Sequence, residues 1–587
     1  MSKAAKRKAK SRRPPDARRA RNQVAPEPAP VQPTAEIQPR AATNDPMNAP
    51  TERSIFPYVV SVLLLLPGVY WVLKDKTVWP YDQAWYGEVS VDLWYLLTHH
   101  PGEWAANMLS AFGTKAPGVA WLGQFFVPLG HVAGSIEFGL MLSILAAHFG
   151  TLLLMYRIGL ALSSGSRAIA LFGMLFAASA PLSAAMTHQY LVESLQVFAV
   201  TYIFWIATAA PKLSRLRLLA HLLTATSVAL LAKTTSPMYC ALAGVLAVIS
   251  LFRATSWVKD RQDRTKSLIL LFIGSVLAAG ALGWYVHNFK TVVAFGKIAT
   301  SGAVALDYGS AGTFYSKLAY WLRATQASFF IPFALPALSL IAFTGMYFAW
   351  KHGYRARPKP ANVLAAVALM HVFIVLALFS FQVNEENRYL LPLLPCIAIC
   401  LMWVLARPMR SYTAALACIL LAIQFAVTNA QALNFTKVNP NISYWLHPYS
   451  SDQTARAELT ELIRVTSVPG AESRYNIVGV ELPWLNANSL DYYAVKGRLE
   501  TGRRSYFTSL GYAETDLERA WTRLEQIGIV YFVSLEEDKQ PSPPDFVNRV
   551  TLPALRRVAS DPAFARVNFP SRLGILLFRR VDPPAGR

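Results

Sequence analysis

The sequence predicts an α-helical polytopic membrane protein of about 11 transmembrane helices that ends in a small α/β domain outside the membrane. The 587 residues are 54% hydrophobic and only 15% charged, with a mean hydropathy of +0.31. That composition is too apolar for an ordinary soluble protein of this length. Apolar runs recur between Ile55 and Ala430, and a helix of about 20 apolar residues crosses a hydrocarbon core of about 30 Å. From about residue 431 the composition changes to that of a soluble domain.

Basic residues gather between alternate apolar runs, and this pattern sets the expected topology. If the N-terminus is cytoplasmic, the positive-inside rule places all of these basic loops inside and the C-terminus outside. The agreement requires that residues 117–130 (PGVAWLGQFFVPLG) do not cross, so we expect an interfacial or re-entrant helix there. The expected spans are residues 55–74, 136–157, 167–182, 187–210, 217–232, 236–252, 267–288, 326–350, 361–381, 388–405 and 411–430.

The N-terminal residues 1–53 are rich in Lys, Arg, Ala and Pro and contain few apolar residues. Such a segment cannot form a core, so we expect a disordered cytoplasmic tail. Much of the net charge of +22 lies in this tail, and we interpret it as a segment that rests on anionic lipid headgroups rather than one that binds nucleic acid. We expect the bilayer to be the inner, cytoplasmic membrane of a bacterial cell.

Two further domains follow the tail. Residues 54–430 form the expected membrane domain, with a first outer loop at 75–135, and residues 431–587 form the periplasmic α/β domain. In the latter, "TDLERAWTRLEQIG" has apolar residues at helical spacing. It contains no P-loop, GxGxxG or GxSxG motif, so we assign the chemistry elsewhere. Its expected strands are "YNIVGV", "RSYFTSL", "GIVYFVSL" and "GILLFRRV".

The candidate functional residues are charged side chains expected on the outer face. Carboxylates beside a bilayer are costly unless they have a partner or a task. Cations in such a setting can bind phosphate through strong charge-assisted hydrogen bonds, and a carboxylate can accept the proton of an attacking hydroxyl. We expect Asp82, Tyr86 and Val89 to share one side of an interfacial helix and Glu88 and Asp92 to share another. The other candidates are Lys115, Glu193, Lys233 and Arg388.

These residues lie in strings that resemble motifs of one enzyme superfamily. "DQAWYGEVS" is similar to the first-loop motif of the C-type (GT-C) integral-membrane glycosyltransferases, in the branch of the protein O-mannosyltransferases and the lipid A aminoarabinose transferases. "TKAPGVAW" is similar to that branch's Lys-Pro-Pro-Leu-x-x-Trp, with Ala116 in place of the first proline. The resemblance covers about residues 55–430. The remaining strings, in the same order as in the family, are "EFGLMLSILAAHFGTLLLMYRIG", "APLSAAMTHQYLVESLQVF", "LLAKTTSPM" and "RYLLPLLP".

The resemblance implies a helical membrane bundle that takes sugar from a polyprenyl-phosphate donor with inversion at the anomeric carbon. It implies a catalytic role for Asp82, which would act as base or position the acceptor, and we place Glu88 with it. It implies that Lys115 and Arg388 hold the lipid phosphate. We also assign Lys233 to the donor site, although its motif lacks the family's Gly-Pro. Glu193 and Tyr86 are assigned to the same site.

No cofactor is assigned, and a divalent cation stays open. Gln83 stands where the family has its second acidic residue, which weakens the argument for a metal at this position. We name no metal-ligating residue: the histidines form no HExxH motif, and the cysteines lie in apolar runs typical of buried small hydrophobic residues. The cysteines are Cys240, Cys396, Cys400 and Cys418.

The sequence therefore predicts a hexosyl- or pentosyltransferase of the cell envelope. Its acceptor would be lipid A or lipopolysaccharide, another glycan, or a protein hydroxyl. Alternatives remain for single residues: Asp82 as a helix N-cap, Lys115 as a lysine that extends to the headgroups, Glu193 as half of an ion pair, and Tyr86 as an interfacial aromatic. Two alternatives remain for the whole chain, namely a transporter or flippase of a lipid-linked glycan and a scaffold that works through its C-terminal domain.

Overall fold

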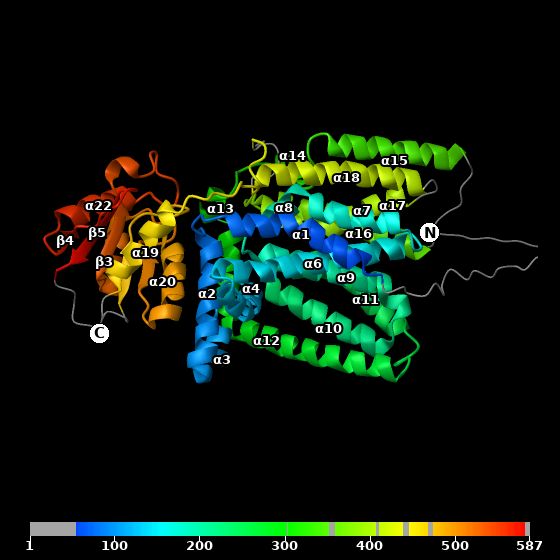
Figure 1. Cartoon of the computed structure of the whole chain (residues 1–587), viewed down its shortest axis with the longest axis horizontal. Coiled ribbons are helices and arrows are strands. Elements are labelled where there is room, and N and C mark those ends of the chain that lie inside the picture. The colour runs from blue at the N-terminus through cyan, green and yellow to red at the C-terminus, as the bar shows by residue number, and fades with distance from the viewer. Residues whose placement is uncertain are drawn as a thin grey trace, which may run out of the picture. The chain divides into compact units, whose positions relative to one another are not determined.

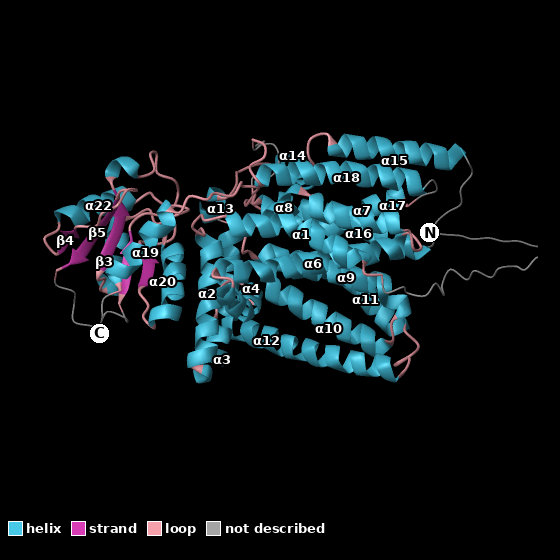
Figure 2. Cartoon of the chain, viewed as in Figure 1, coloured by secondary structure: helices cyan, strands magenta, loops and turns pink. Residues whose placement is uncertain are grey.

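The structure is a computed structural model, and it describes most of the chain after the N-terminal tail. The predicted tail, residues 1–53, lies outside the described residues. The chain that follows folds into a helical membrane domain and a smaller domain with one sheet (Figure 1, Figure 2). The described ranges are residues 54–301, 303–351, 359–406, 410–437, 445–467 and 474–581.

Within these ranges, nine helices are long and apolar enough to cross a membrane, or ten if a bent pair counts as one span. The multi-pass membrane fold that the sequence predicts is therefore confirmed, whereas the count of 11 is not. The bent pair is α14 (Phe314–Phe329) and α15 (Ala334–Lys351), and α7 (Arg167–Ser179) is apolar but shorter. The remaining spans are α1 (Phe56–Lys74), α6 (Ile136–Leu162), α9 (Val192–Ala209), α10 (Arg215–Ala232), α11 (Ser236–Arg253), α12 (Arg261–Thr300), α16 (Lys359–Ser380), α17 (Leu394–Leu405) with the 3₁₀ turn η3 (Asn387–Leu393), and α18 (Arg410–Ala432).

Three predicted span boundaries were wrong. The expected span 326–350 instead holds the end of α14 and nearly all of α15, which meet at 86°, because Pro332 cannot continue the helix of the preceding residues. The expected span 267–288 continues as α12 to Thr300, since apolarity marks the edge of a bilayer but does not end a helix. The expected span 187–210 begins as a helix only at Val192.

The segment predicted as the first outer loop contains α2 (Tyr81–His99), α3 (Pro101–Ser110), α4 (Gly118–Gly123) and α5 (Val127–Val132). Figure 1 shows α2 running across one end of the membrane helices rather than along them. The segment 117–130 forms short helices, as expected for a segment that does not cross as one helix. Gly118 allows close packing there, because a Cβ atom would lie 2.5 Å from the Leu231 carbonyl oxygen.

The C-terminal domain is an α/β unit with a five-stranded sheet in the order β2-β1-β3-β5-β4 (Figure 2). Strands β2, β1 and β3 are parallel, and β5 pairs antiparallel with both β3 and β4. The four predicted strands are present as β1, β2, β3 and β5, whereas β4, a short and mostly exposed edge strand, was missed. The helices and strands of the C-terminal domain are α19 (Thr454–Thr466), β1 (Tyr475–Val478), α20 (Ala487–Thr501), β2 (Tyr506–Ser509), α21 (Leu517–Ile527), β3 (Tyr531–Leu535), α22 (Thr551–Ser560), β4 (Phe564–Val567) and β5 (Ile575–Arg580).

The C-terminal domain packs directly on the first outer loop through α20 and α2. The ring of Trp79 stacks on Tyr492 with 5.0 Å between centroids and on Tyr190 with 5.4 Å. The Ser489 hydroxyl donates to the Trp79 carbonyl oxygen at 2.7 Å. A buried aromatic stack of this kind, closed by a hydrogen bond, ties the segment before α2 to both domains.

Candidate functional site

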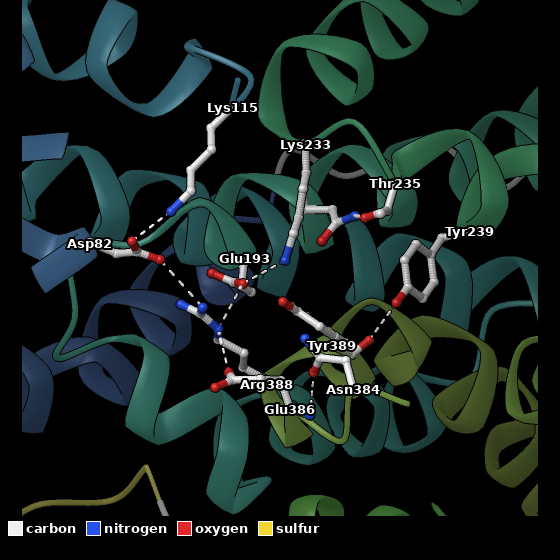
Figure 3. Close-up of polar contacts among 11 residues, drawn as sticks. Asp82, Lys115, Glu193, Lys233, Thr235, Tyr239, Asn384, Glu386, Arg388 and Tyr389 are labelled. Atoms are coloured by element: carbon white, nitrogen blue, oxygen red, sulfur yellow. Dashed lines mark hydrogen bonds and ion pairs between the residues drawn. The ribbon is translucent and has the colours of Figure 1, made fainter. Parts of the chain in front are cut away.

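The structure brings five of the predicted residues together where several helices end (Figure 3). Asp82 lies in the first turn of α2 and Glu193 in the first turn of α9, where a negative charge is favoured by the helix dipole. Lys233 is the C-cap residue of α10, Arg388 lies in η3, and Lys115 lies in the loop before α4. Residues up to 306 positions apart in the sequence are thus joined into one polar cluster.

Asp82 is held between two cations. Lys115 Nζ donates to Asp82 Oδ1 at 2.6 Å, and Arg388 Nη2 donates to Asp82 Oδ2 at 3.4 Å. The side chain of Asp82 is 28% exposed, that of Lys115 21% and that of Arg388 15%, so water reaches all three. Burial alone would raise the pKa of Asp82, but the charges and hydrogen bonds of the two cations outweigh it and hold the pKa well below its usual range. The carboxylate is therefore ionised at neutral pH.

Glu193 lies deeper and joins Arg388 to a third cation, Lys233. Its Oε1 atom accepts from Lys233 Nζ at 2.7 Å and lies 3.6 Å from Arg388 Nε. The Glu193 side chain is 1% exposed, so its charge depends on these partners. Glu193 therefore forms an ion pair, one of the two readings left open by the sequence. It also orients Arg388, which contacts Asp82.

Sequence reasoning missed two residues of the same cluster. Glu386 Oε2 lies 2.8 Å from Arg388 Nε, and the Tyr389 ring lies 4.1 Å from Lys233 Nζ. The Tyr239 hydroxyl donates to the Tyr389 carbonyl oxygen at 2.6 Å and fixes that backbone. A signal was present: "NEENRYLL" places two acids next to an arginine in an outer segment.

The cluster carries balanced charge, with three carboxylates against three cations. A phosphate that enters must replace carboxylate oxygens as the partner of the cations, as its bidentate geometry allows. The carboxylates are Asp82, Glu193 and Glu386, and the cations are Lys115, Lys233 and Arg388. Among the described residues no three His, Cys, Asp or Glu side chains are grouped so that they could hold a metal ion. The involvement of a divalent cation stays open.

The structure does not bring Glu88 into this cluster. Glu88 lies on another side of α2 and forms an ion pair with Arg504 of the C-terminal domain, and burial raises its pKa although the arginine opposes the shift. Asp92, one turn later on α2, lies 3.1 Å from Arg504 and 2.9 Å from Arg498. The predicted division of α2 into two charged sides is present, and the second side faces the C-terminal domain.

Tyr86 adjoins the cluster without a polar contact to it. Its buried ring meets Phe112 edge-on with 5.0 Å between centroids, and Lys115 Nζ lies 5.9 Å from the ring centroid. The ring centroid of Trp85 lies 4.9 Å from the same ammonium. The two aromatic rings therefore fix the path of the Lys115 side chain towards Asp82.

Comparison with known proteins adds a structural likeness. No protein-family model matches this sequence, and no curated protein matches it. The structure resembles ArnT from Cupriavidus metallidurans in the apo state, with a TM-score of 0.50 and 14% sequence identity over 90% of this chain and 98% of that chain. It resembles the same protein bound to undecaprenyl phosphate with a TM-score of 0.53 and 13% identity over 91% of this chain and 100% of that chain. The predicted resemblance to the C-type glycosyltransferases is therefore confirmed at the level of the fold.

Proposed function

We propose that this chain is an integral-membrane glycosyltransferase that takes a sugar from a polyprenyl-phosphate donor. The acceptor is a hydroxyl group of an envelope molecule, either lipid A or lipopolysaccharide, another glycan, or a protein. Transfer takes place on the outer face of the inner membrane, with the N-terminus in the cytoplasm and the C-terminal domain in the periplasm. Residues 54–430 hold the reaction site, and residues 431–587 form the outer domain that packs on it.

The observation that carries this proposal is the position of Asp82 between Lys115 and Arg388. A carboxylate that water can reach, flanked by two cations with a third cation behind them, suits a reaction in which a hydroxyl attacks and a phosphate leaves. The structural likeness to ArnT bound to undecaprenyl phosphate supports a lipid-phosphate donor. The membrane setting supports it further, since such a donor diffuses in the bilayer.

The proposed reaction is an inverting displacement at the anomeric carbon. The acceptor oxygen forms a bond to that carbon while the bond from the carbon to the phosphate oxygen breaks, and the electron pair leaves with the lipid phosphate. Lys115 and Arg388 stabilise the negative charge that develops on the phosphate. As these cations turn to the phosphate, Asp82 loses part of their stabilisation, becomes more basic, and accepts the proton of the acceptor hydroxyl.

The test is a transfer assay on the purified full chain with a panel of polyprenyl-phosphate sugars and an extract of envelope lipids and glycans. We expect Asp82→Asn to lower kcat at least about 100-fold, the usual size of a lost general base. The matched control is Asp538→Asn, which makes the same change at an exposed residue of the C-terminal domain. Full activity in Asp82→Asn would overturn the role of Asp82.

The same preparation separates this proposal from the two alternatives. A flippase moves the lipid-linked sugar between leaflets of a vesicle and leaves the bond to phosphate intact. A scaffold cleaves no donor in the assay. Translocation of intact donor by the parent chain, or failure to cleave any member of the panel, would therefore contradict the proposed transferase.

A further inference from the structure

Three loops of the C-terminal domain follow the carboxyl ends of its parallel strands, and they gather at one edge of the sheet. Glu481 follows β1, Tyr512 follows β2, and Phe546 lies in the segment after β3. In open α/β sheets, ligands bind in the crevice outside the carboxyl ends of the strands. None of the five residues of the reaction site lies at this edge of the sheet.

The edge faces the outer segment 303–313 of the membrane domain. The hydroxyl groups of Tyr308 and Tyr512 are hydrogen-bonded to each other, and Phe546 meets Tyr308 edge-on with 5.1 Å between centroids. Phe546 also meets Tyr512 at 6.4 Å, and Arg549 Nη2 lies 3.0 Å from Asp307 Oδ1. We call Tyr308, Tyr512 and Phe546 the aromatic wall. It joins residues of both domains.

Two chains of contacts connect the aromatic wall to the reaction site. On one side, the amide of Glu385 donates to the Tyr308 carbonyl oxygen at 3.0 Å, and the next residue, Glu386, pairs with Arg388. On the other side, the hydroxyl of Tyr81, the neighbour of Asp82, donates to the Glu481 carbonyl oxygen at 3.4 Å. Asn548, which lies two residues after Phe546, accepts from the Glu481 amide at 2.8 Å.

The pKa values of both tyrosines of the wall respond to the charge of Asp82. Burial raises the pKa of Tyr512, and the negative charge of Asp82 contributes in the same direction. The pKa of Tyr308 is raised by burial, by its hydrogen bond to Tyr512 and, to a smaller extent, by the same carboxylate. Tyr512 is nevertheless 61% exposed. Tyr512 therefore offers an aromatic surface to solvent, and its partner Tyr308 is joined through Glu385 to the segment that holds Arg388.

We propose that the aromatic wall binds the sugar ring of the acceptor, so that the C-terminal domain takes part in acceptor recognition. This inference rests on the proposed transferase function. A tyrosine offers a flat apolar face to the C–H groups of a sugar and a hydroxyl group to its polar edge. The charged residues at the rim, Arg549 and Asp307, are paired with each other, so the wall offers aromatic faces and hydroxyl groups to a neutral ring.

Glu481 adds a hydrogen-bonding group at the same edge. Its Oε1 atom is buried and has no hydrogen-bond partner among the described residues. Burial, together with the negative charge of Asp545, raises the pKa of Glu481 to about 8, so the group is mostly protonated at neutral pH. A neutral carboxylic acid donates one hydrogen bond and accepts others, as a sugar hydroxyl requires.

The test compares transfer with hydrolysis of the same donor in the purified full chain, using the panel member that the parent cleaves. Water replaces the acceptor in hydrolysis, so a residue that holds only the acceptor affects transfer alone. We expect Tyr512→Ala to raise the KM for a glycan acceptor at least about fivefold and to leave donor hydrolysis within about twofold of the parent. Tyr512→Phe keeps the ring and should lose less. Tyr315→Ala, which removes an 80% exposed tyrosine from α14, should change neither rate.

The outcomes distinguish the two proposals. A parent chain that neither transfers nor hydrolyses would contradict the transferase function itself. If the parent transfers and Tyr512→Ala keeps the parental acceptor KM, the aromatic wall does not bind the acceptor. Equal losses of transfer and hydrolysis in Tyr512→Ala would likewise overturn the inference, because they would show that the substitution damages the reaction site or the fold.

Discussion

Lys115 Nζ lies 2.6 Å from Asp82 Oδ1, and this contact joins two short segments of the first outer loop into one charged pair. Because the pair is partly buried, its energy depends on the balance between burial, which raises the pKa of the carboxyl group, and the cations, which lower it. Removing one cation shifts that balance. The pH dependence of the reaction therefore reports on this contact.

We expect Lys115→Met to raise the pKa of Asp82, because burial persists while the larger of the two cationic contributions is lost. In the parent, the carboxylate stays ionised until the pH falls below its usual range, so Asp82 sets no acid limb near neutral pH. In the variant, the acid limb of kcat/KM should therefore move to higher pH. The measurement is the pH profile of sugar transfer, with Lys76→Met in the same outer loop as the control. Superimposable profiles for parent and Lys115→Met would contradict the assigned contact.

A second prediction concerns the buried pair of Glu193 and Lys233. Breaking a buried ion pair from one side leaves an uncompensated charge, which costs about 3–5 kcal/mol. Glu193→Gln and Lys233→Met should each destabilise the chain in detergent. The double variant should lose less than the sum of the two single losses, by about 0.5–3 kcal/mol. Thermal unfolding of the four proteins in one detergent measures this coupling, and strict additivity would show that the two side chains do not interact.

The fold was predictable where one physical signal dominates. Apolar runs located the spans, and helical spacing in "TDLERAWTRLEQIG" located α21, which Asp516 caps and Gly528 ends with a φ of 62°. The extension of α12 and the break after α14 were not predictable from apolarity. The helix α12 continues beyond its apolar run, whereas α14 ends before Pro332 although the apolar run continues.

The candidate site was predictable only in part, because spacing along the chain says little about contacts between distant segments. The motifs located the five residues that meet, including the pair Asp82 and Arg388. They did not reveal that the partner of Glu88 is Arg504, which lies 416 residues further on. An acidic residue in an outer loop looks the same in sequence whether it faces a substrate or another domain.

A third prediction tests the role of Glu88, which the sequence placed with the catalytic residues. The pair formed by Glu88 and Arg504 favours a role in holding the C-terminal domain on α2. In that role, Glu88→Gln and Arg504→Met break the same contact. Both should speed proteolytic cleavage between the domains and should reduce transfer to a similar degree, with donor hydrolysis retained.

The opposite pattern would restore the catalytic reading. If Glu88→Gln abolishes hydrolysis of the donor while Arg504→Met does not, then Glu88 acts on the reaction itself. Arg519→Met is the matched control for the arginine, since it removes an exposed ion pair with Glu514 within the C-terminal domain, and surface pairs contribute about 1 kcal/mol or less.

The last prediction concerns the orientation of the chain, on which the outer location of the site depends. Basic residues cluster around the connection between α11 and α12, and the positive-inside rule assigns that connection to the cytoplasm. Glu103 in α3 and Gln262 at the start of α12 are both exposed. A cysteine at position 103 should therefore react with a membrane-impermeant maleimide in intact cells, and a cysteine at position 262 should react only after permeabilisation. The four native cysteines are buried or half-buried in membrane helices, so the parent chain provides the background. Labelling of Gln262→Cys alone in intact cells would place Asp82 on the cytoplasmic side and would contradict transfer on the outer face.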